Sequence, residues 1–156
     1  MNWDAIGAIG EILGAAAVFA SLIYLAVQTK QNTRALKSAA FHQIRSSFSE
    51  VSLAVVQDPT LVSLLQRIRG DDPDIPIEDA TRFTYFLTTF LRRGESAYFQ
   101  SSQGALEYES WLGIKRTILM LLGNRYGQQF WHSESTRFTA EFVKVIDEAI
   151  KESNFK

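Results

Sequence analysis

The chain has 156 residues, of which 46% are hydrophobic and 21% are charged, a composition that excludes a disordered charged tail, a collagen-like chain and a disulfide-rich mini-protein. Its 16 Lys and Arg residues against 17 Asp and Glu give a formal charge of -1, which offers no electrostatic footprint for nucleic acid, so we expect no nucleic-acid partner. The absence of Cys excludes disulfides, Cys-ligated metal sites and a thiol nucleophile.

The first predicted element is an apolar N-terminal helix. Residues 5 to 27 contain a single charged side chain, Glu11, and as a helix they would be roughly 35 Å long, against a bilayer hydrocarbon core of about 30 Å. Trp3 and Tyr24 lie near the two ends, where interfacial aromatic residues are expected. The alternative is the buried helix of a soluble protein, but core helices of this length normally have a polar face. The sequence therefore predicts a transmembrane helix within residues 1–29, with the lipid bilayer as a partner.

The charges that flank this helix predict its orientation. The N-terminus carries no basic residue, whereas Lys30, Arg34 and Lys37 follow the apolar segment. A cleavable signal peptide would need a basic N-terminal region, so we expect the helix to stay as a membrane anchor. By the positive-inside rule, the N-terminus would lie outside and residues 30–156 would lie in the cytoplasm.

The helix is predicted to continue well past the membrane. No Gly or Pro, the usual helix terminators, occurs between Ala15 and Asp58. Asp58 and Pro59 then form an N-cap and first-turn pair for a new helix. The last part of the long helix has an apolar stripe at alternating spacings of 3 and 4, which needs a partner: Phe41, Ile44, Phe48, Val51 and Val55.

The remaining sequence is helical in pattern as well. No period-2 strand pattern occurs, and helices are expected at about 59–69, 77–103, 107–122 and 135–153, with the long first helix ending at about 57. A turn-rich loop at 70–76 and a segment with Gly, Asn and Gln at 123–134 would separate them. We therefore predict an all-α protein in which one N-terminal transmembrane helix continues as a long helix into a cytoplasmic helical bundle formed by residues 30–156.

Several stretches resemble a family of small bacterial membrane-anchored all-α proteins. The resemblance covers most of the chain and rests on IYLAVQTKQNTRAL at 23–36, RRGESAYFQSSQG at 92–104, Trp111 and the Phe130–Trp131 pair. It implies a single-pass protein of the bacterial inner membrane. The family has no assigned activity, so no catalytic or binding residue is transferred from it.

The most informative pattern in the apolar helix is a seam of small side chains at alternating spacings of 3 and 4. This small-residue seam consists of Gly7, Gly10, Gly14, Ala17 and Ser21. Close backbone approach at small residues is a main source of helix association in lipid, although Gly and Ala are also common in membrane helices generally. Because the chain supplies one such helix, the expected partner is another copy, which makes the protein a homo-oligomer.

Polar residues lie on or beside this seam. Glu11 is one turn from Gly7 and from Gly14, and the same spacing continues to Tyr24, Gln28 and Gln31. A carboxylate inside a membrane segment is costly and marks a candidate functional site, so these residues are candidates for lining a pore or binding an ion. The alternative is a carboxyl group that reaches the outer interface or is protonated.

Signatures of enzymes are missing. His42 and His132 have no metal-ligand spacing around them, and no GxSxG, Walker A or GxGxxG motif occurs. The acidic residues of the 70–79 region lack the order of a calcium loop and are expected to form a solvated loop. Glu95, among aromatic residues, is expected to make an ion pair or hydrogen bond that fixes packing, and the alternative is that it marks a binding pocket with Tyr98. We expect no catalytic residue, no metal and no cofactor, and hence no enzyme.

Two functions are left open by these observations. The first is a homo-oligomeric membrane protein held together by the small-residue seam, which would form an ion-conducting or solute pore. The second is a membrane-tethered accessory subunit whose helical bundle docks another protein. The self-complementary seam favours the first of these.

Overall fold

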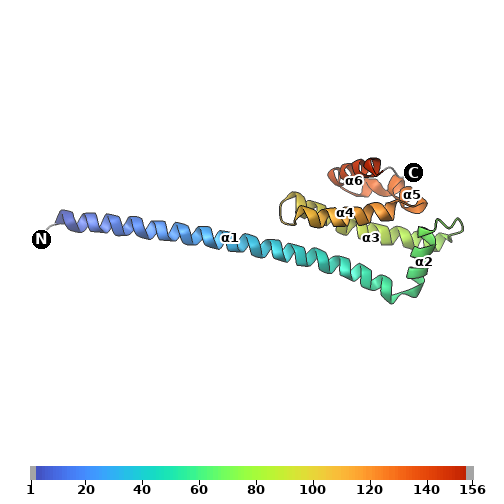
Figure 1. Cartoon of the computed structure of the whole chain (residues 1–156), viewed down its shortest axis with the longest axis horizontal. Coiled ribbons are helices and arrows are strands. Elements are labelled where there is room, and N and C mark those ends of the chain that lie inside the picture. The colour runs from blue at the N-terminus through green and yellow to red at the C-terminus, as the bar shows by residue number, and fades with distance from the viewer. Residues whose placement is uncertain (1–2, 154–156) are drawn as a thin grey trace. The chain divides into compact units, whose positions relative to one another are not determined.

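The computed structural model describes residues 3–153, without the side chains of residues 4–6, and its regular elements over that range are all helices (Figure 1). The prediction of an all-α protein is confirmed; the first two residues of the expected membrane segment lie outside the described residues. The elements are α1 (Trp3–Gln57), α2 (Pro59–Arg69), α3 (Ile77–Ser102), α4 (Tyr108–Leu122), α5 (Arg125–Glu134), the 3-10 helix η1 (Ser135–Arg137) and α6 (Ala140–Glu152).

The chain divides into two units, Met1–Ala39 and Ala40–Lys156. The first unit holds the N-terminal part of α1, and every side chain described from Gly7 to Ala39 is exposed. Among them are large apolar residues: Ile9, Ile12, Leu13, Val18, Phe19, Leu22, Ile23, Leu25 and Val27. By length and composition this helix could span a membrane.

The second unit begins within α1 and continues through a short, well-capped helix. Ile44 is buried, and the ring of Phe48 lies 5.0 Å from that of Phe90 on α3, so the apolar stripe of α1 finds part of its partner there. As predicted, α2 starts at Asp58 and Pro59. The Asp58 carboxylate accepts hydrogen bonds from the amides of Thr60 (3.0 Å) and Leu61 (3.2 Å), which satisfies two backbone donors at the helix start.

The core of this unit lies between α3, α4 and α6. Helix α3 packs on α4, and α4 packs in turn on α5 and α6. The close approach of α3 and α4 depends on Gly94, because a Cβ there would lie 2.6 Å from Cδ1 of Ile118. Phe142 on α6 is fully buried, with the rings of Trp111 and Tyr98 at 6.2 and 6.1 Å.

The connection after α3 shows why that helix ends where it does. Gly104 has a positive φ of 71°, a conformation that costs glycine little. The amide of Ala105 donates to the carbonyl of Gln100 (2.9 Å), and that of Gly104 donates to Ser101 (3.0 Å). These two bonds form a Schellman motif, which satisfies the last carbonyls of α3.

The segment 123–134, expected to separate two helices, is itself largely helical, and the last helix begins at Ala140 rather than at about 135. Asn124 caps α5, since its side chain accepts from the amide of Gly127 (2.9 Å). Gly127 is not a helix breaker here. A Cβ on it would lie 2.7 Å from Cα of Leu122, so glycine is required by the close passage of the preceding helix. The prediction of a break at 123–134 was wrong because the need for glycine at 127 comes from packing against the end of α4, which the local sequence pattern does not show.

Candidate functional site

The small-residue seam is unoccupied on the isolated chain. Gly7, Gly10 and Gly14 are exposed, and a Cβ built on any of them would meet no heavy atom within 4 Å. Ala17 and Ser21 are exposed too, and the Ser21 hydroxyl donates to the Ala17 carbonyl (2.8 Å). This face of α1 therefore carries only small side chains, and its one hydroxyl group already has a hydrogen-bond partner. Such a face allows the close helix packing that occurs in lipid.

The polar residues associated with the seam are exposed as well. Glu11, Tyr24, Gln28 and Gln31 all lie on the surface of α1. Within residues 3–153, no side-chain hydrogen bond or ion pair links them to one another or to the second unit. The structure thus places these candidate residues along one helix and leaves open what they face.

A second candidate site, which was not predicted, is an apolar groove inside the second unit. It has a volume of about 700 Å³ and lies between the 41–56 part of α1 and helix α4, with Phe90 of α3 in its wall. We call it the α1–α4 groove. Its lining consists of Phe41, Ile44, Arg45, Phe48, Ser49, Ser52, Leu53, Val56, Phe90, Leu106, Ser110, Gly113, Ile114 and Thr117.

The groove exists because part of the apolar stripe of α1, and apolar residues beside it, are not covered. Within the stripe Ile44 is 6% exposed but Phe41 is 40% exposed, and beside it Leu53 and Val56 are 56% and 74% exposed. Gly113, on the α4 side, leaves open space where a side chain would otherwise stand. The sequence signals were the unpartnered stripe and a glycine inside a helix, but neither one locates a groove without the tertiary structure.

Most of the hydroxyl groups that line the groove donate hydrogen bonds within their own helix. The hydroxyls of Ser49, Ser52 and Thr117 donate to the carbonyls four residues earlier, at 2.9, 3.1 and 3.2 Å. Arg45 is the one charged side chain in the lining. Its guanidinium lies 6.0 Å from the Phe41 ring, and no carboxylate of residues 3–153 lies within ion-pair distance of it.

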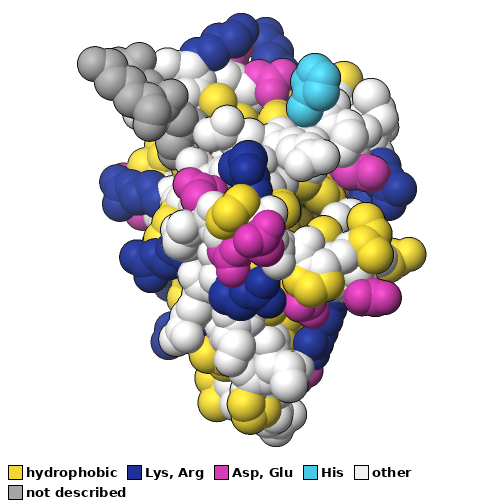
Figure 2. Space-filling view, turned by 90° about the vertical axis from the view of Figure 1, so that its right-hand side faces the viewer, with side chains coloured by type: hydrophobic (Ala, Val, Ile, Leu, Met, Phe, Trp, Pro, Cys, Tyr) yellow, Lys and Arg dark blue, Asp and Glu magenta, His cyan; other side chains and the backbone are white. Residues whose placement is uncertain are grey.

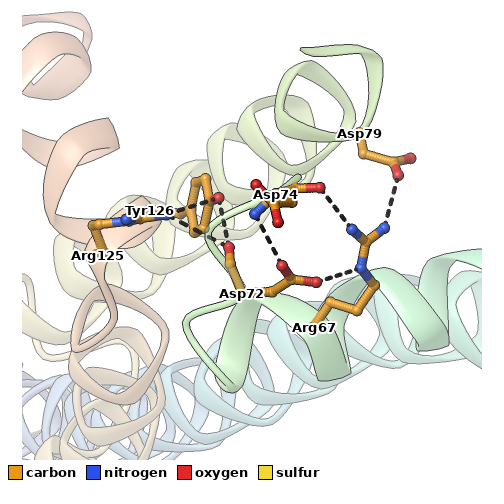
Figure 3. A network of polar contacts seen from close by, with 6 residues as sticks. All are labelled: Arg67, Asp72, Asp74, Asp79, Arg125 and Tyr126. Atoms are coloured by element: carbon orange, nitrogen blue, oxygen red, sulfur yellow. Dashed lines mark hydrogen bonds and ion pairs between the residues drawn. The ribbon is translucent and has the colours of Figure 1, made fainter. Parts of the chain in front are cut away.

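The acidic 70–79 region includes the solvent-exposed loop that was expected between α2 and α3, and a network of polar contacts around Arg67 orders it (Figure 3). The Arg67 side chain donates to the Asp72 carboxylate (2.8 Å) and to the Asp74 carbonyl (2.9 Å), and lies 3.7 Å from Asp79. The hydrogen bond from Arg67, together with that from the amide of Asp74, lowers the pKa of Asp72 below its ordinary value. The Tyr126 hydroxyl donates to the Asp72 carbonyl (2.8 Å), which ties the loop to α5.

This network fixes the loop and gives no sign of a ligand site. Three of its carboxylates are used by protein donors: Asp72 and Asp79 face Arg67, and the Asp71 side chain accepts from the amide of Arg125 (3.0 Å) at the start of α5. Among the described residues, no group of His, Asp and Glu side chains converges in a way that could hold a metal ion. The charges are therefore explained by the positioning of the α2–α3 connection.

Glu95 has a similar positioning role, as the sequence predicted. It is 15% exposed, and its carboxylate accepts from the Arg92 side chain (3.0 Å) and from the amide of Thr139 (2.6 Å), directly before α6. Arg92 in turn lies 5.1 Å from the ring centroid of Phe138. Glu95 thus joins α3 to the start of the last helix.

The face of the molecule drawn in Figure 2 does not point to a particular partner. In Figure 2, basic and acidic side chains alternate over the visible face, with apolar side chains between them, so that face carries no extended field of one sign.

Comparisons with protein-family models, with curated proteins and with solved structures find no match to this chain. The seam and the groove are therefore the features of this chain that bear on its function.

Proposed function

We propose that the protein is a single-pass membrane protein that self-associates through the small-residue seam of α1. The observation that carries this proposal is the complete exposure of the described side chains from Gly7 to Ala39, many of them large and apolar. Burial of one Leu, Ile or Phe side chain is worth about 1.5–3 kcal/mol, so a helix of this kind is stable only in lipid or against another protein. The length of the apolar segment favours lipid.

The seam favours a second copy of the chain as the partner within the membrane. The open space around Gly7, Gly10 and Gly14 lets two backbones approach closely, and identical faces are self-complementary. No other membrane helix of this chain is available for the role within the described residues, because α1 alone meets the length and composition for a span.

The cytoplasmic placement of the second unit is part of the same proposal. Lys30, Arg34 and Lys37 follow the apolar segment, and the sequence contains no Asp or Glu between Glu11 and Glu50. Such an uncompensated basic stretch is retained on the cytoplasmic side and is attracted to anionic lipid headgroups.

A pore is the more specific form of the proposal. Glu11 flanks the seam, and Tyr24, Gln28 and Gln31 continue its spacing with polar groups. In a ring of helices, Tyr24, Gln28 and Gln31 would continue the face of the seam toward a common axis, and the Glu11 carboxylate at the edge of that face would attract cations.

The mass of the full chain in lipid nanodiscs tests self-association. We expect a discrete multiple of the 17.6 kDa protomer by native mass spectrometry. Gly10→Ile and Gly14→Ile should reduce the mass to that of a monomer, since each adds bulk to the seam, whereas Ala16→Ile, on the opposite side of the helix, should not. A monomeric wild type would overturn the proposal. Stable co-purification of a different chain would support the accessory-subunit alternative instead.

A further inference from the structure

The α1–α4 groove has the dimensions of a site for one extended hydrocarbon chain. The α1 residues that line it run from Phe41 to Val56, about 22 Å of helix. An acyl chain in one bilayer leaflet spans about half of a 30 Å hydrocarbon core. The volume of about 700 Å³ lies within the range of small-molecule sites. The groove therefore has room for one long chain and for a headgroup at its end.

The walls of the groove suit such a chain chemically. The exposed side chains of Phe41, Leu53 and Val56 present hydrocarbon, and Ile44, Phe48 and Phe90 add further apolar lining. The hydroxyl groups of Ser49, Ser52 and Thr117 donate hydrogen bonds to backbone carbonyls and so need no partner from a ligand. The groove thus offers apolar contact along its length and little directional hydrogen bonding.

One end of the groove carries a cation without an acidic partner. Arg45 lies one turn from Phe41, where the groove begins along α1, and no carboxylate among the side chains that the structure describes is within ion-pair distance of it. The chain around it is also free of acids, since no Asp or Glu occurs between Glu11 and Glu50. A guanidinium in this setting is matched by a carboxylate, which it can bind through two parallel hydrogen bonds.

We propose that the α1–α4 groove binds a long-chain fatty acid, with its hydrocarbon tail along α1 and its carboxylate on Arg45. The α1–α4 groove has one apolar surface and one cation, which match a ligand with one hydrocarbon tail and one negative charge. This site is distinct from the seam, and the proposal does not require that the seam self-associates.

Charge complementarity favours this occupant over a second copy of α1. If another copy placed the same part of its α1 in the groove, it would bring an acid-free stretch with a second Arg45. The guanidinium would then face like charge rather than a partner, which is destabilising. A fatty acid supplies the missing negative charge together with the apolar surface.

Photo-crosslinking in nanodiscs tests the proposal with the full chain. The bilayer is zwitterionic phosphatidylcholine, and the probe is a trace of a long-chain fatty acid with a diazirine on its tail. After irradiation, labelled peptides are identified by mass spectrometry. We expect label on residues 41–56 and 106–117, and competition by oleate that is much stronger than competition by its uncharged methyl ester.

Two variants and two matched controls separate the groove from the rest of the molecule. Gly113→Leu fills the groove without meeting a protein atom near its Cβ, and should reduce groove labelling about tenfold relative to wild type. Arg45→Gln should reduce it about fivefold, the factor expected for a strong exposed ion pair. Arg116→Leu and Arg116→Gln change an exposed residue of α4 outside the groove and should leave labelling unchanged.

Label on the apolar segment 7–27 reports independently on membrane insertion. Label there without label in the groove would overturn the fatty-acid site and leave the membrane proposal intact. Groove label without label on 7–27 would support the site and contradict the membrane anchor. Equal competition by oleate and its methyl ester, or groove label that survives Gly113→Leu, would overturn the proposal, as would cross-linking of a benzophenone amino acid at Leu53 to a second copy of the chain.

Discussion

Gly94 of α3 lies so close to Ile118 of α4 that a Cβ on the glycine would be 2.6 Å from the Ile118 Cδ1 atom, and 3.8 Å from the ring of Phe142. Ile118 and Phe142 are both fully buried, so a shift of the Ile118 side chain would have to be accommodated within the core. The contact between the two central helices of the second unit therefore depends on the absence of a side chain at this position.

Gly94→Ala should destabilise the second unit by about 1–3 kcal/mol, the usual cost of overpacking a core. Gly113→Ala in α4 is the matched control, because a Cβ there meets nothing within 4 Å. It should instead stabilise the unit by roughly 0.5–1 kcal/mol, since alanine is the better helix former. Thermal unfolding followed by tryptophan fluorescence compares the two variants. An unchanged midpoint for Gly94→Ala would contradict the close α3–α4 contact.

Local signals accounted for most of the fold. The all-α class followed from the helical periodicity, and the break after Gln57 followed from Asp58 and Pro59, whose cap is present in the structure. The failure at 123–134 has a tertiary cause, because Gly127 is needed where α5 passes the end of α4. A glycine read alone in a sequence indicates a break as readily as a close approach.

The candidate sites were less predictable than the fold. The stripe from Phe41 to Val55 indicated that α1 needs a partner, but the groove depends on how far α4 stands from α1, which no local pattern encodes. The Arg67 network was missed for a similar reason, since Tyr126 and Arg125 reach it from the other end of the chain. The role of the seam and of Glu11 stays a prediction, because no hydrogen bond or ion pair of the described residues joins Glu11 to another element, and a Cβ at Gly7, Gly10 or Gly14 meets nothing within 4 Å.

Two carboxylates with lowered pKa values, Asp72 in the Arg67 network and Asp58 at the start of α2, predict that acid destabilises the protein. The hydrogen bond from Arg67 lowers the pKa of Asp72, and the hydrogen bond from Thr60 lowers that of Asp58, each from an ordinary value of 3.8. Between the lowered and the ordinary pKa values the unfolded state binds more protons, so this contribution to stability is complete above about pH 4 and is lost as the pH falls through the folded-state values. Urea unfolding between pH 2 and 6 should show this loss.

Substitution at Asp72 separates this network from general acid denaturation. Asp72→Asn should reduce the pH dependence below pH 4 and leave the part that Asp58 contributes, because only the carboxylate that Arg67 binds is removed. Asp74→Asn should retain it, since Asp74 takes part through its backbone carbonyl and amide. Equal slopes for wild type and Asp72→Asn would show that the network does not contribute.

The ion pairs of Glu95 and Glu50 should contribute different amounts to the free energy of unfolding. Glu95 is 15% exposed and accepts from Arg92 and from the amide of Thr139, so Glu95→Ala should cost about 1.5–3 kcal/mol and loosen the start of α6. Glu50 is 67% exposed and lies 3.4 Å from Arg93, so Glu50→Ala should cost roughly 0–1 kcal/mol. Hydrogen exchange of the first turn of α6 should rise in the Glu95 variant alone. Equal effects of the two substitutions would argue against a positioning role for Glu95.

Glu11 offers the direct test of the pore form of the proposed function. If the helices surround a hydrated axis, Glu11→Gln removes the charge that favours cations and should lower cation flux into liposomes by about tenfold or more, with less effect on anions. The protein should still show the mass of the oligomer, because Glu11 lies beside the seam and not on it. Flux that is equal in wild type and Glu11→Gln, with the oligomer intact, would separate self-association from conduction. The seam would then be an assembly interface alone, and the polar residues Tyr24, Gln28 and Gln31 would face other helices rather than water.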